Sequence, residues 1–474
     1  MLIKYYKWNK KERKQLFKSC SSNLELFECQ FYQPFFSLYF YLHNTKHSHK
    51  AIDIHRRYYV SKIGDIIRED YDTSNTLVDC LILDNKHKTT FQKTLFCKCI
   101  PLLDPLYFMM NNYNNLVHRN PLLPSNYSYN TYDKINNMNN SAYIDTFFSY
   151  ICSELTLNNK NPSFPIFYGC INGIKRKLKY DITEDYSNFK REIWFHKGLG
   201  NTHTIDMYVS SSDSEDEGDS GSDDGSNNEY VSLLKDIPTQ LFFIEELDGT
   251  LEDFLGMGHE INIDIILSCI FQISFALTYL QKHFKFTHND LHINNVMYTK
   301  TDKTYLYYKF NNIYYKVPTY GYIFKIIDFG RSIFEYHNKW FFNDTFDKHG
   351  EAGGQYTYPI NKLLFKEGGN KDKIKPNYSF DLCRLAITII DVCDIDKYLD
   401  YKEKQSFVNF LINLTLDDKG NSLSELKDDF NMYITISKDA AHAIPRKVIQ
   451  NYIFNGYRIK KKSFPKKLFY GLKN

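Results

Sequence analysis

Two short segments constrain this chain more than any other part of its sequence: residues 288–295, which read His-Asn-Asp-Leu-His-Ile-Asn-Asn, and the tripeptide Asp-Phe-Gly at residues 328–330. In the first segment Asp290 and Asn295 lie five positions apart, after a long apolar stretch typical of a helix. The second segment directly follows a predicted strand, residues 322–327. A carboxylate that could accept a proton is therefore followed by amide and carboxylate oxygens that suit a divalent cation. A turn cap or a strand end would explain either segment alone, but both in this order indicate one shared site.

The chain is long enough for two to three domains, or for one bilobal domain with extensions, because it has 474 residues, of which 43% are hydrophobic and 17% aromatic. Its net charge of +3 does not by itself indicate nucleic-acid binding. The ten cysteines are scattered without a CxxC pair, which favours structural thiols in a reducing compartment over metal ligands. Residues 1–22 are basic and polar without an apolar run, so we expect no signal peptide.

Residues 263–280 are apolar enough to resemble a membrane span. Polar residues interrupt this stretch, among them Asp264, Gln272 and Thr278, and it ends just before the segment that contains Asp290. We therefore predict a buried core helix and no membrane span.

The first half of the chain predicts a β-rich region. The expected elements are strands at residues 77–83, 94–100, 165–169 and 241–244, and a helix at residues 141–155 with Ser141 as its N-cap. Residues 210–229 are rich in Ser, Asp, Glu and Gly and nearly free of apolar residues. Such a composition cannot bury enough apolar surface to fold, so we expect a disordered acidic insertion.

The second half predicts a hairpin, residues 305–310 with 313–317, and then mostly helices. The last residues form a Lys/Arg-rich tail, for which a solvated segment is favoured over contact with nucleic acid. We expect four regions: an N-terminal extension (1–55), a small lobe (56–247), a larger helical lobe (248–455) and a basic tail (456–474).

Lys98 is the single basic residue in an otherwise apolar part of the strand at residues 94–100. A lysine in such a place must reach solvent, as an edge-strand residue would, or meet an anion. Its acidic partner would lie on the helix at residues 141–155, where Asp145 is preferred and Glu154 is the alternative. Either acid could also be a solvated residue on the helix surface.

With Lys98, Asp290, Asn295 and Asp328 in this order, the chain resembles the eukaryotic-type protein kinase superfamily over roughly residues 56–400. It looks most like the divergent haspin-like kinases of large DNA viruses, because the loop reads Asp-Leu-His. The resemblance implies a bilobal α+β fold with a small β-rich lobe and a larger helical lobe. It also implies ATP and Mg²⁺ as cofactors, a protein substrate phosphorylated on Ser or Thr, and a location in the cytoplasm, or in the host cytoplasm or virion if viral.

The resemblance assigns roles to individual residues. Asp290 would accept the proton of the attacking hydroxyl, and Asn295 and Asp328 would hold Mg²⁺. Lys98 would bind the α- and β-phosphates and pair with Asp145.

Three further roles follow from the resemblance. His288 would brace the catalytic loop, and Asp381 would bond backbone N–H groups of that loop. In the lobe-connecting segment, residues 244–249, the backbone of Glu245 and Leu247 would bind adenine.

The sequence departs from the kinase pattern at four places. Gly64 is the only candidate for the Gly-rich loop, and no Ala-Pro-Glu follows Gly330. Asn289 replaces the arginine beside the catalytic Asp, so we do not expect control by loop phosphorylation. His292 stands where Ser/Thr kinases carry a lysine for the γ-phosphate. His292 also fits a small-molecule phosphotransferase, and the missing Gly-rich loop fits a pseudokinase scaffold, so both stay as alternatives to an active protein kinase.

Overall fold

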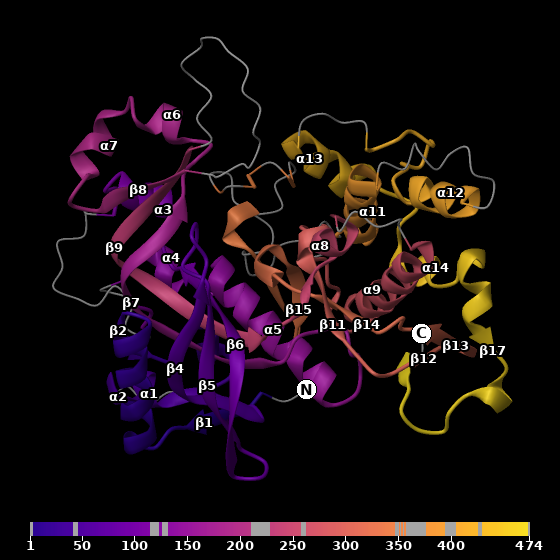
Figure 1. Cartoon of the computed structure of the whole chain (residues 1–474), viewed down its shortest axis with the longest axis horizontal. Helices are drawn as coiled ribbons and strands as arrows, with labels where there is room; N and C mark the ends of the chain where they lie inside the picture. Colours follow the sequence, from indigo (N-terminus) through magenta and orange to yellow (C-terminus); the bar gives the residue numbers. More distant parts are fainter. Residues whose placement is uncertain are drawn as a thin grey trace. The chain divides into compact units, whose positions relative to one another are not determined.

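The computed structural model of this chain is a mixed α+β structure that divides into two compact units (Figure 1). Unit 1 comprises Met1–Met138 and Phe167–Glu246, and unit 2 comprises Asn139–Ile166 and Leu247–Asn474. The structure describes residues 3–40, 46–113, 123–125, 131–209, 228–256, 262–346, 350, 352–353, 355–356, 376–393, 404–424 and 429–472. The acidic insertion predicted at residues 210–229 lies outside the described residues, except for Asn228 and Glu229, which begin a strand.

Unit 1 is built on one antiparallel sheet with the strand order β2-β7-β9-β6-β5-β4, and β8 pairs with β9. The strands are β2 (Leu26–Gln30), β4 (Tyr58–Glu69), β5 (Thr76–Asp84), β6 (Thr89–Pro101), β7 (Phe167–Asp181), β8 (His203–Val209) and β9 (Asn228–Glu245). A small separate sheet joins β1 (Tyr5–Lys7) to β3 (Ile52–Ile54). The helices of this unit are α1 (Lys10–Asn23), α2 (Lys46–Ala51), α3 (Pro105–Met109), α4 (Asp133–Asn136), α6 (Tyr186–Phe189) and α7 (Ile193–Gly198).

The predicted strands are present, and two of them are much longer than expected. Along β5 the buried side chains alternate, with Val78, Cys80 and Ile82 inside, which is the period-two pattern of a strand with one face on a core. The predicted strand at residues 165–169 overlaps only the first residues of β7, and the one at residues 241–244 is a short part of β9. Their outer halves pack around a separate apolar cluster, which includes Leu178, Ile182, Phe195, Leu234 and Ile237 and which the sequence did not predict.

The N-terminal segment, expected as an extension, is an integral part of the unit 1 sheet, because β2 pairs with β7. A buried ion pair joins it to the sheet. Both guanidinium N–H₂ groups of Arg56 lie 2.9 Å from the carboxylate oxygens of Asp53, and only 4% and 1% of these two side chains are exposed. The Nε of Arg56 donates to the carbonyl of Tyr168 at 2.9 Å. The next residue, Gly169, has φ +139°, and a Cβ there would come within 2.3 Å of Arg56 Nη2.

We expect Asp53→Ala to lower the free energy of unfolding by about 3 to 5 kcal/mol, because it leaves the Arg56 guanidinium buried without its counter-charge. Urea denaturation followed by circular dichroism measures this change. Asp65→Ala, at an exposed position on β4, is the matched control and should change stability by less than about 0.5 kcal/mol. A loss no larger for Asp53→Ala than for the control would contradict the structural role of the pair.

In the described part of unit 2, helices combine with three small sheets. The helices are α5 (Ser141–Leu157), α8 (Leu251–Gly256), α9 (Ile263–Phe284), α11 (Phe380–Cys393), α12 (Gln405–Leu414), α13 (Asp429–Asp439) and α14 (Pro445–Val448). The sheets are β10 (Gly249–Thr250), β11 (Val296–Lys300) and β14 (Tyr322–Ile326); β17 (Arg458–Ile459), β13 (Ile313–Pro318), β12 (Tyr305–Phe310) and β18 (Tyr470–Leu472); and β15 (Ile333–Tyr336) with β16 (Lys339–Phe342). The predicted hairpin at residues 305–317 and the strand that precedes Asp328 are both present.

The long helix α9 forms the centre of unit 2. Among the described residues it is the one helix long and apolar enough to cross a membrane, but 72% of the residues in its apolar window are buried inside the fold. Asn262 caps its first turn by accepting the N–H of Asp264 at 3.1 Å. The prediction of a core helix agrees with this burial.

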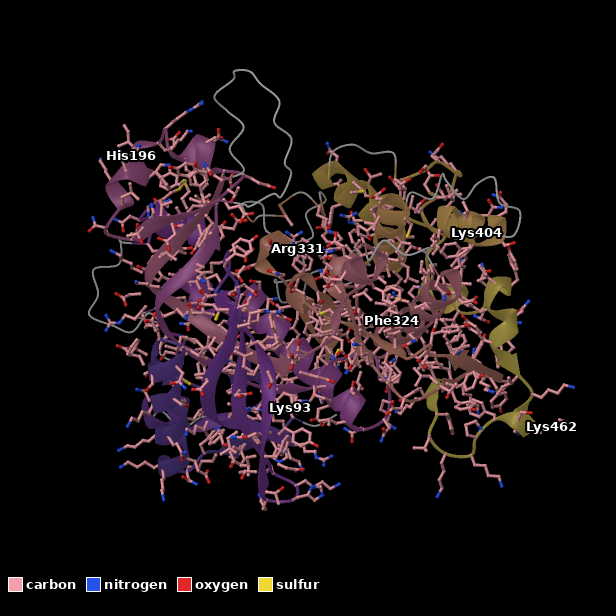
Figure 2. All side chains as sticks on the ribbon, viewed as in Figure 1. Lys93, His196, Phe324, Arg331, Lys404 and Lys462 are labelled. Carbon is pink, nitrogen blue, oxygen red and sulfur yellow. The ribbon has the colours of Figure 1, made fainter. Side chains whose placement is uncertain are left out.

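Three sequence expectations need correction. The N-cap of α5 is Asn140, whose side chain accepts the N–H of Ala142 at 3.1 Å, and Ser141 is already helical. Helix α5, expected in the small lobe, groups with unit 2 by its contacts. The expected solvated tail instead adds β17 and β18 to the hairpin sheet, and Phe464 packs on Tyr314 with ring centroids 4.9 Å apart. The aromatic residues of this segment anchor it, while lysines such as Lys462 stay exposed (Figure 2).

Candidate active site

The segment that carries Asp290 connects α9 to β11 in unit 2 and is held at both ends. Helix α9 ends where Lys285 adopts a left-handed conformation with φ +48°. Thr287 then exchanges two backbone hydrogen bonds of 2.9 Å with Ile333. At the far end, residues Ile293–Asn295 form a short 3-10 turn, η3, that leads into β11.

Asp381, in the first turn of α11, holds the backbone of this loop by hydrogen bonds. Its carboxylate accepts the N–H of His288 at 3.0 Å on both oxygens and the N–H of Asn289 at 3.0 Å. The two N–H groups can converge on one acceptor because Asn289 has φ +65°, a conformation that asparagine tolerates. Burial raises the pKa of the Asp381 carboxyl, and the charge of His288 and the two N–H groups partly oppose this rise. These are the backbone hydrogen bonds expected of Asp381.

His288 links the loop to the segment before Asp-Phe-Gly. The Nε2 of its fully buried ring lies 2.8 Å from the carbonyl oxygen of Ile327, and the ring centroid lies 5.7 Å from that of Phe329. Nε2 must carry a proton to donate to this carbonyl. His288 therefore fixes the distance between the two motifs.

Asn295 is oriented by a hydrogen bond from its side-chain amide. The amide nitrogen donates to the main-chain carbonyl of Asp290 at 2.8 Å and lies 3.0 Å from Nε2 of His292. The main-chain carbonyl of Asn295 accepts the N–H of Ile327 at 3.1 Å. Because the side-chain nitrogen donates to the carbonyl of Asp290, the side-chain oxygen is the atom left for a ligand, and it has no hydrogen-bond partner within the described part of the chain.

Phe329 is held in an aromatic core, and its backbone is fixed by Asp145. Its ring centroid lies 5.2 Å from that of Phe148 on α5 and 6.0 Å from that of Phe286. The carboxylate of Asp145, also on α5 and buried, accepts the N–H of Phe329 at 3.0 Å. Asp328 itself has φ +59° and accepts the N–H of Gly330 at 3.4 Å. The preferred acid Asp145 thus contacts the tripeptide, whereas Glu154 accepts from the side chain of Asn158, the C-cap of the same helix.

Asp290 has two side-chain partners that the sequence did not identify. Its Oδ1 accepts the hydroxyl proton of Tyr433, on α13, at 2.6 Å, and its Oδ2 lies 3.8 Å from Nε of Arg331. Arg331 directly follows Asp-Phe-Gly, so its position in the sequence could have indicated it. Nothing near Tyr433 in the sequence signals a contact with a residue 143 positions away.

Asn289 also has a structural role of its own. Its side chain donates to the carbonyl of Arg331 at 3.1 Å and accepts the hydroxyl proton of Tyr356. The position that carries arginine in the kinase pattern thus joins the loop to the residues after Asp-Phe-Gly through neutral hydrogen bonds.

Lys98 and Glu245 belong to unit 1, where they lie on the neighbouring strands β6 and β9, and Leu247 begins unit 2. Lys98 is half-buried and pairs in register with Phe242. The turn between β4 and β5, residues 70–75, lies next to this part of β6, because the side chain of Asn75 accepts the N–H of Cys99 at 3.0 Å. This turn contains no glycine, and Gly64 instead lies within β4.

No known protein-family profile matches the chain. Over 238 residues, 49% of the chain, it is 25% identical to a Drosophila melanogaster protein named serine/threonine-protein kinase haspin homolog. Over 94 residues, 18% of the chain, it is 37% identical to a Dictyostelium discoideum protein named "probable serine/threonine-protein kinase". Over 103 residues, 18% of the chain, it is 37% identical to an uncharacterized protein of Invertebrate iridescent virus 6. The matches cover 37%, 8% and 17% of these relatives, so the chain spans little more than a third of their length at most.

These similarities support a protein-kinase-like family and a kinase-like function for the chain. The mixed α+β structure is compatible with such a fold. The predicted resemblance to kinases is supported at this level. The viral relative gives only a weak indication of closeness to viral kinases, because it is itself uncharacterized.

We expect Asp381→Ala to lower the free energy of unfolding by about 2 to 5 kcal/mol, because the buried N–H groups of His288 and Asn289 lose their acceptor. Chemical denaturation gives the value, with Asp302→Ala, at an exposed position of the same unit, as the control. Equal stability of the two variants would show that the loop does not depend on this carboxylate.

Burial lowers the pKa of His292 below its ordinary value of 6.5. The charge of Asp290 opposes this lowering, and the charge of Arg384 adds to it. The neutral ring is therefore favoured in the folded state, so its contribution to stability is complete above about pH 6.5 and is lost as the pH falls through the folded pKa. We expect the stability advantage of the wild type over His292→Gln to shrink between about pH 7.5 and pH 5. Denaturation curves across this range test it, and a constant difference would contradict it.

Proposed function

We propose that this chain is an ATP- and Mg²⁺-dependent protein kinase that transfers the γ-phosphoryl group to a protein hydroxyl of the Ser/Thr type. The observation that carries the proposal is that Asp290, Asn295 and the segment leading to Asp328 form one hydrogen-bonded unit. Asn295 binds the carbonyl of Asp290 with its side chain and the N–H of Ile327 with its main chain. The kinase names of two relatives support the same reaction class.

The donor atoms fit magnesium. The amide oxygen of Asn295 and the carboxylate of Asp328 are hard oxygen ligands, which Mg²⁺ prefers. Within the described residues, no group of three or more His, Cys, Asp or Glu side chains could hold a metal ion. Two protein oxygens are too few for an octahedral ion, so nucleotide phosphates and water would complete the coordination. When bound, the ion would neutralise negative charge on the phosphates.

In the proposed reaction, Asp290 orients the acceptor hydroxyl and takes its proton as the oxygen bonds to the γ-phosphorus. The bond to the β-phosphate oxygen breaks, and ADP leaves. Nε of Arg331 lies 3.8 Å from the second oxygen of the Asp290 carboxylate. Asp381 and His288 act as positioning residues, because they hold the backbone on which Asp290 and Asp328 stand.

We further propose that Lys98 binds the α- and β-phosphates and pairs with Asp145, and that the backbone of Glu245 and Leu247 binds adenine. The turn at residues 70–75 would lie over the phosphates, but it has two aspartates and no glycine. We therefore expect weaker ATP binding than a Gly-rich loop gives, since the aspartates repel phosphate.

The chain's cysteines support a cytoplasmic location. None of the ten forms a disulfide and nine of them are buried, as suits a reducing compartment.

A small-molecule phosphotransferase is a second candidate, and His292 favours it. A histidine that contacts Asn295 and is held neutral by burial does not offer the positive charge that the lysine of Ser/Thr kinases provides. Parallel incubation with labelled ATP and either protein or metabolite pools separates the two: label in protein supports the kinase, and label in metabolites alone supports the alternative.

Asp290→Asn should lower the rate of phosphoryl transfer by about 10² to 10⁴-fold, because the amide cannot accept the proton. Lys98→Met should instead weaken binding of Mg-ATP. Transfer of labelled phosphate and the thermal shift with Mg-ATP measure the two effects separately, and saturating nucleotide at a hundred times its Kd should add about 2.7 kcal/mol of stability.

Lys93→Met is the matched control, because Lys93 lies on the same strand β6 (Figure 2). It should leave transfer and nucleotide binding unchanged. Full transfer activity in Asp290→Asn would falsify the proposed proton acceptor, and equal nucleotide affinity in the two lysine variants would reject the role of Lys98.

A further inference from the structure

The hydroxyl of Tyr433 is hydrogen-bonded to Oδ1 of Asp290, an oxygen that could accept the substrate's proton in the proposed reaction. It donates to Oδ1 at 2.6 Å, while Arg331 lies beside Oδ2. A hydroxyl whose proton a carboxylate takes must lie about 2.6 to 3.2 Å from that carboxylate. Tyr433 therefore meets the distance criterion for an acceptor hydroxyl.

The ring of Tyr433 is held in this position by residues of α11. Its centroid lies 5.9 Å from that of Phe380, and the guanidinium carbon of Arg384 lies 5.1 Å over it. Burial raises the pKa of Tyr433 to about 12, the charge of Asp290 adds to the rise, and Arg384 opposes it. The phenol is thus protonated at any physiological pH and remains a hydrogen-bond donor.

Helix α13 is itself fixed by hydrogen bonds outside the Tyr433 contact. The side chain of Asn377 donates to the carbonyls of Ile436 and Ala440 at 3.2 and 2.9 Å. The hydroxyl of Ser437 donates to the carbonyl of Gln355 at 2.8 Å. The contact with Asp290 therefore belongs to a packed helix, not to a freely rotating surface side chain.

We propose that Tyr433 acts as a built-in competitor of the substrate, with its hydroxyl in the place that an acceptor hydroxyl takes at Asp290. This inference rests on the proposed kinase function. An external acceptor can reach Oδ1 only after the phenol leaves, so the protein substrate or a regulator must displace Tyr433. Gln355 contacts α13 and its neighbour Tyr356 contacts Asn289, so a shift of these two residues would affect both sides of the contact.

Tyr433→Phe tests the inference, because it removes the hydroxyl and keeps the ring that contacts Phe380 and Arg384. Two probes are used: hydrolysis of Mg-ATP, in which water is the acceptor, and phosphorylation of dephosphorylated casein. We expect the rate of hydrolysis and kcat/KM for casein to rise by roughly tenfold or more, the effect of losing one competing hydrogen bond to a charged acceptor. For casein the change should lie mainly in KM, and the affinity for Mg-ATP should not change.

Tyr452→Phe, at a tyrosine that is 63% exposed in the same unit, is the control and should leave both rates unchanged. A Tyr433→Phe variant that binds Mg-ATP but is no faster than the wild type, including one in which both are inactive, overturns the inference. A slower variant also overturns it and would make Tyr433 a residue that assists transfer. Failure of the wild type to bind Mg-ATP, seen as no thermal shift, would instead remove the proposed function and this inference with it.

Discussion

The buried carboxylate of Asp381 is the contact on which the arrangement of unit 2 depends. It holds two consecutive N–H groups, those of His288 and Asn289, at 3.0 Å. Buried N–H groups must find acceptors, and an ionised acceptor makes stronger bonds than a neutral one. The bend that turns both groups toward one carboxylate also sends the next residue, Asp290, away from the core. Helix α11, through Asp381, thus positions the half-buried Asp290.

Further hydrogen bonds connect the loop at residues 288–295 to the Asp-Phe-Gly segment at residues 328–330. His288 contacts the carbonyl of Ile327, and Asn295 binds both the carbonyl of Asp290 and the N–H of Ile327. Phe329 then packs against aromatic side chains of α5 and the loop, and Asp145 fixes its N–H. Because the partners just named are buried side chains or main-chain groups, the positions of Asp290, Asn295 and Asp328 are set together.

The same rigidity explains why the contact of Tyr433 matters. An acid held in place by several buried groups cannot turn away from a hydroxyl that a packed helix presents to it. Access of a substrate would then be decided by α13 and by residues 355–356, which contact both the helix and Asn289. Asn289 makes this connection with neutral hydrogen bonds, where the kinase pattern would have a charged arginine.

The sequence by itself determined the local elements and the chemistry of the loop, because both depend on residues close together in the chain. The alternating burial along β5 and the hairpin at residues 305–317 could be predicted, and the spacing of Asp290 and Asn295 indicated their chemistry. The extent of β7 and β9, the place of the C-terminal strands, and the contact of Tyr433 could not be predicted. These depend on packing between segments far apart in sequence, which local patterns do not encode. Only the tertiary structure decided which distant side chain meets Asp290, since a tyrosine on a helix carries no sequence signal of the partner that folding brings to it.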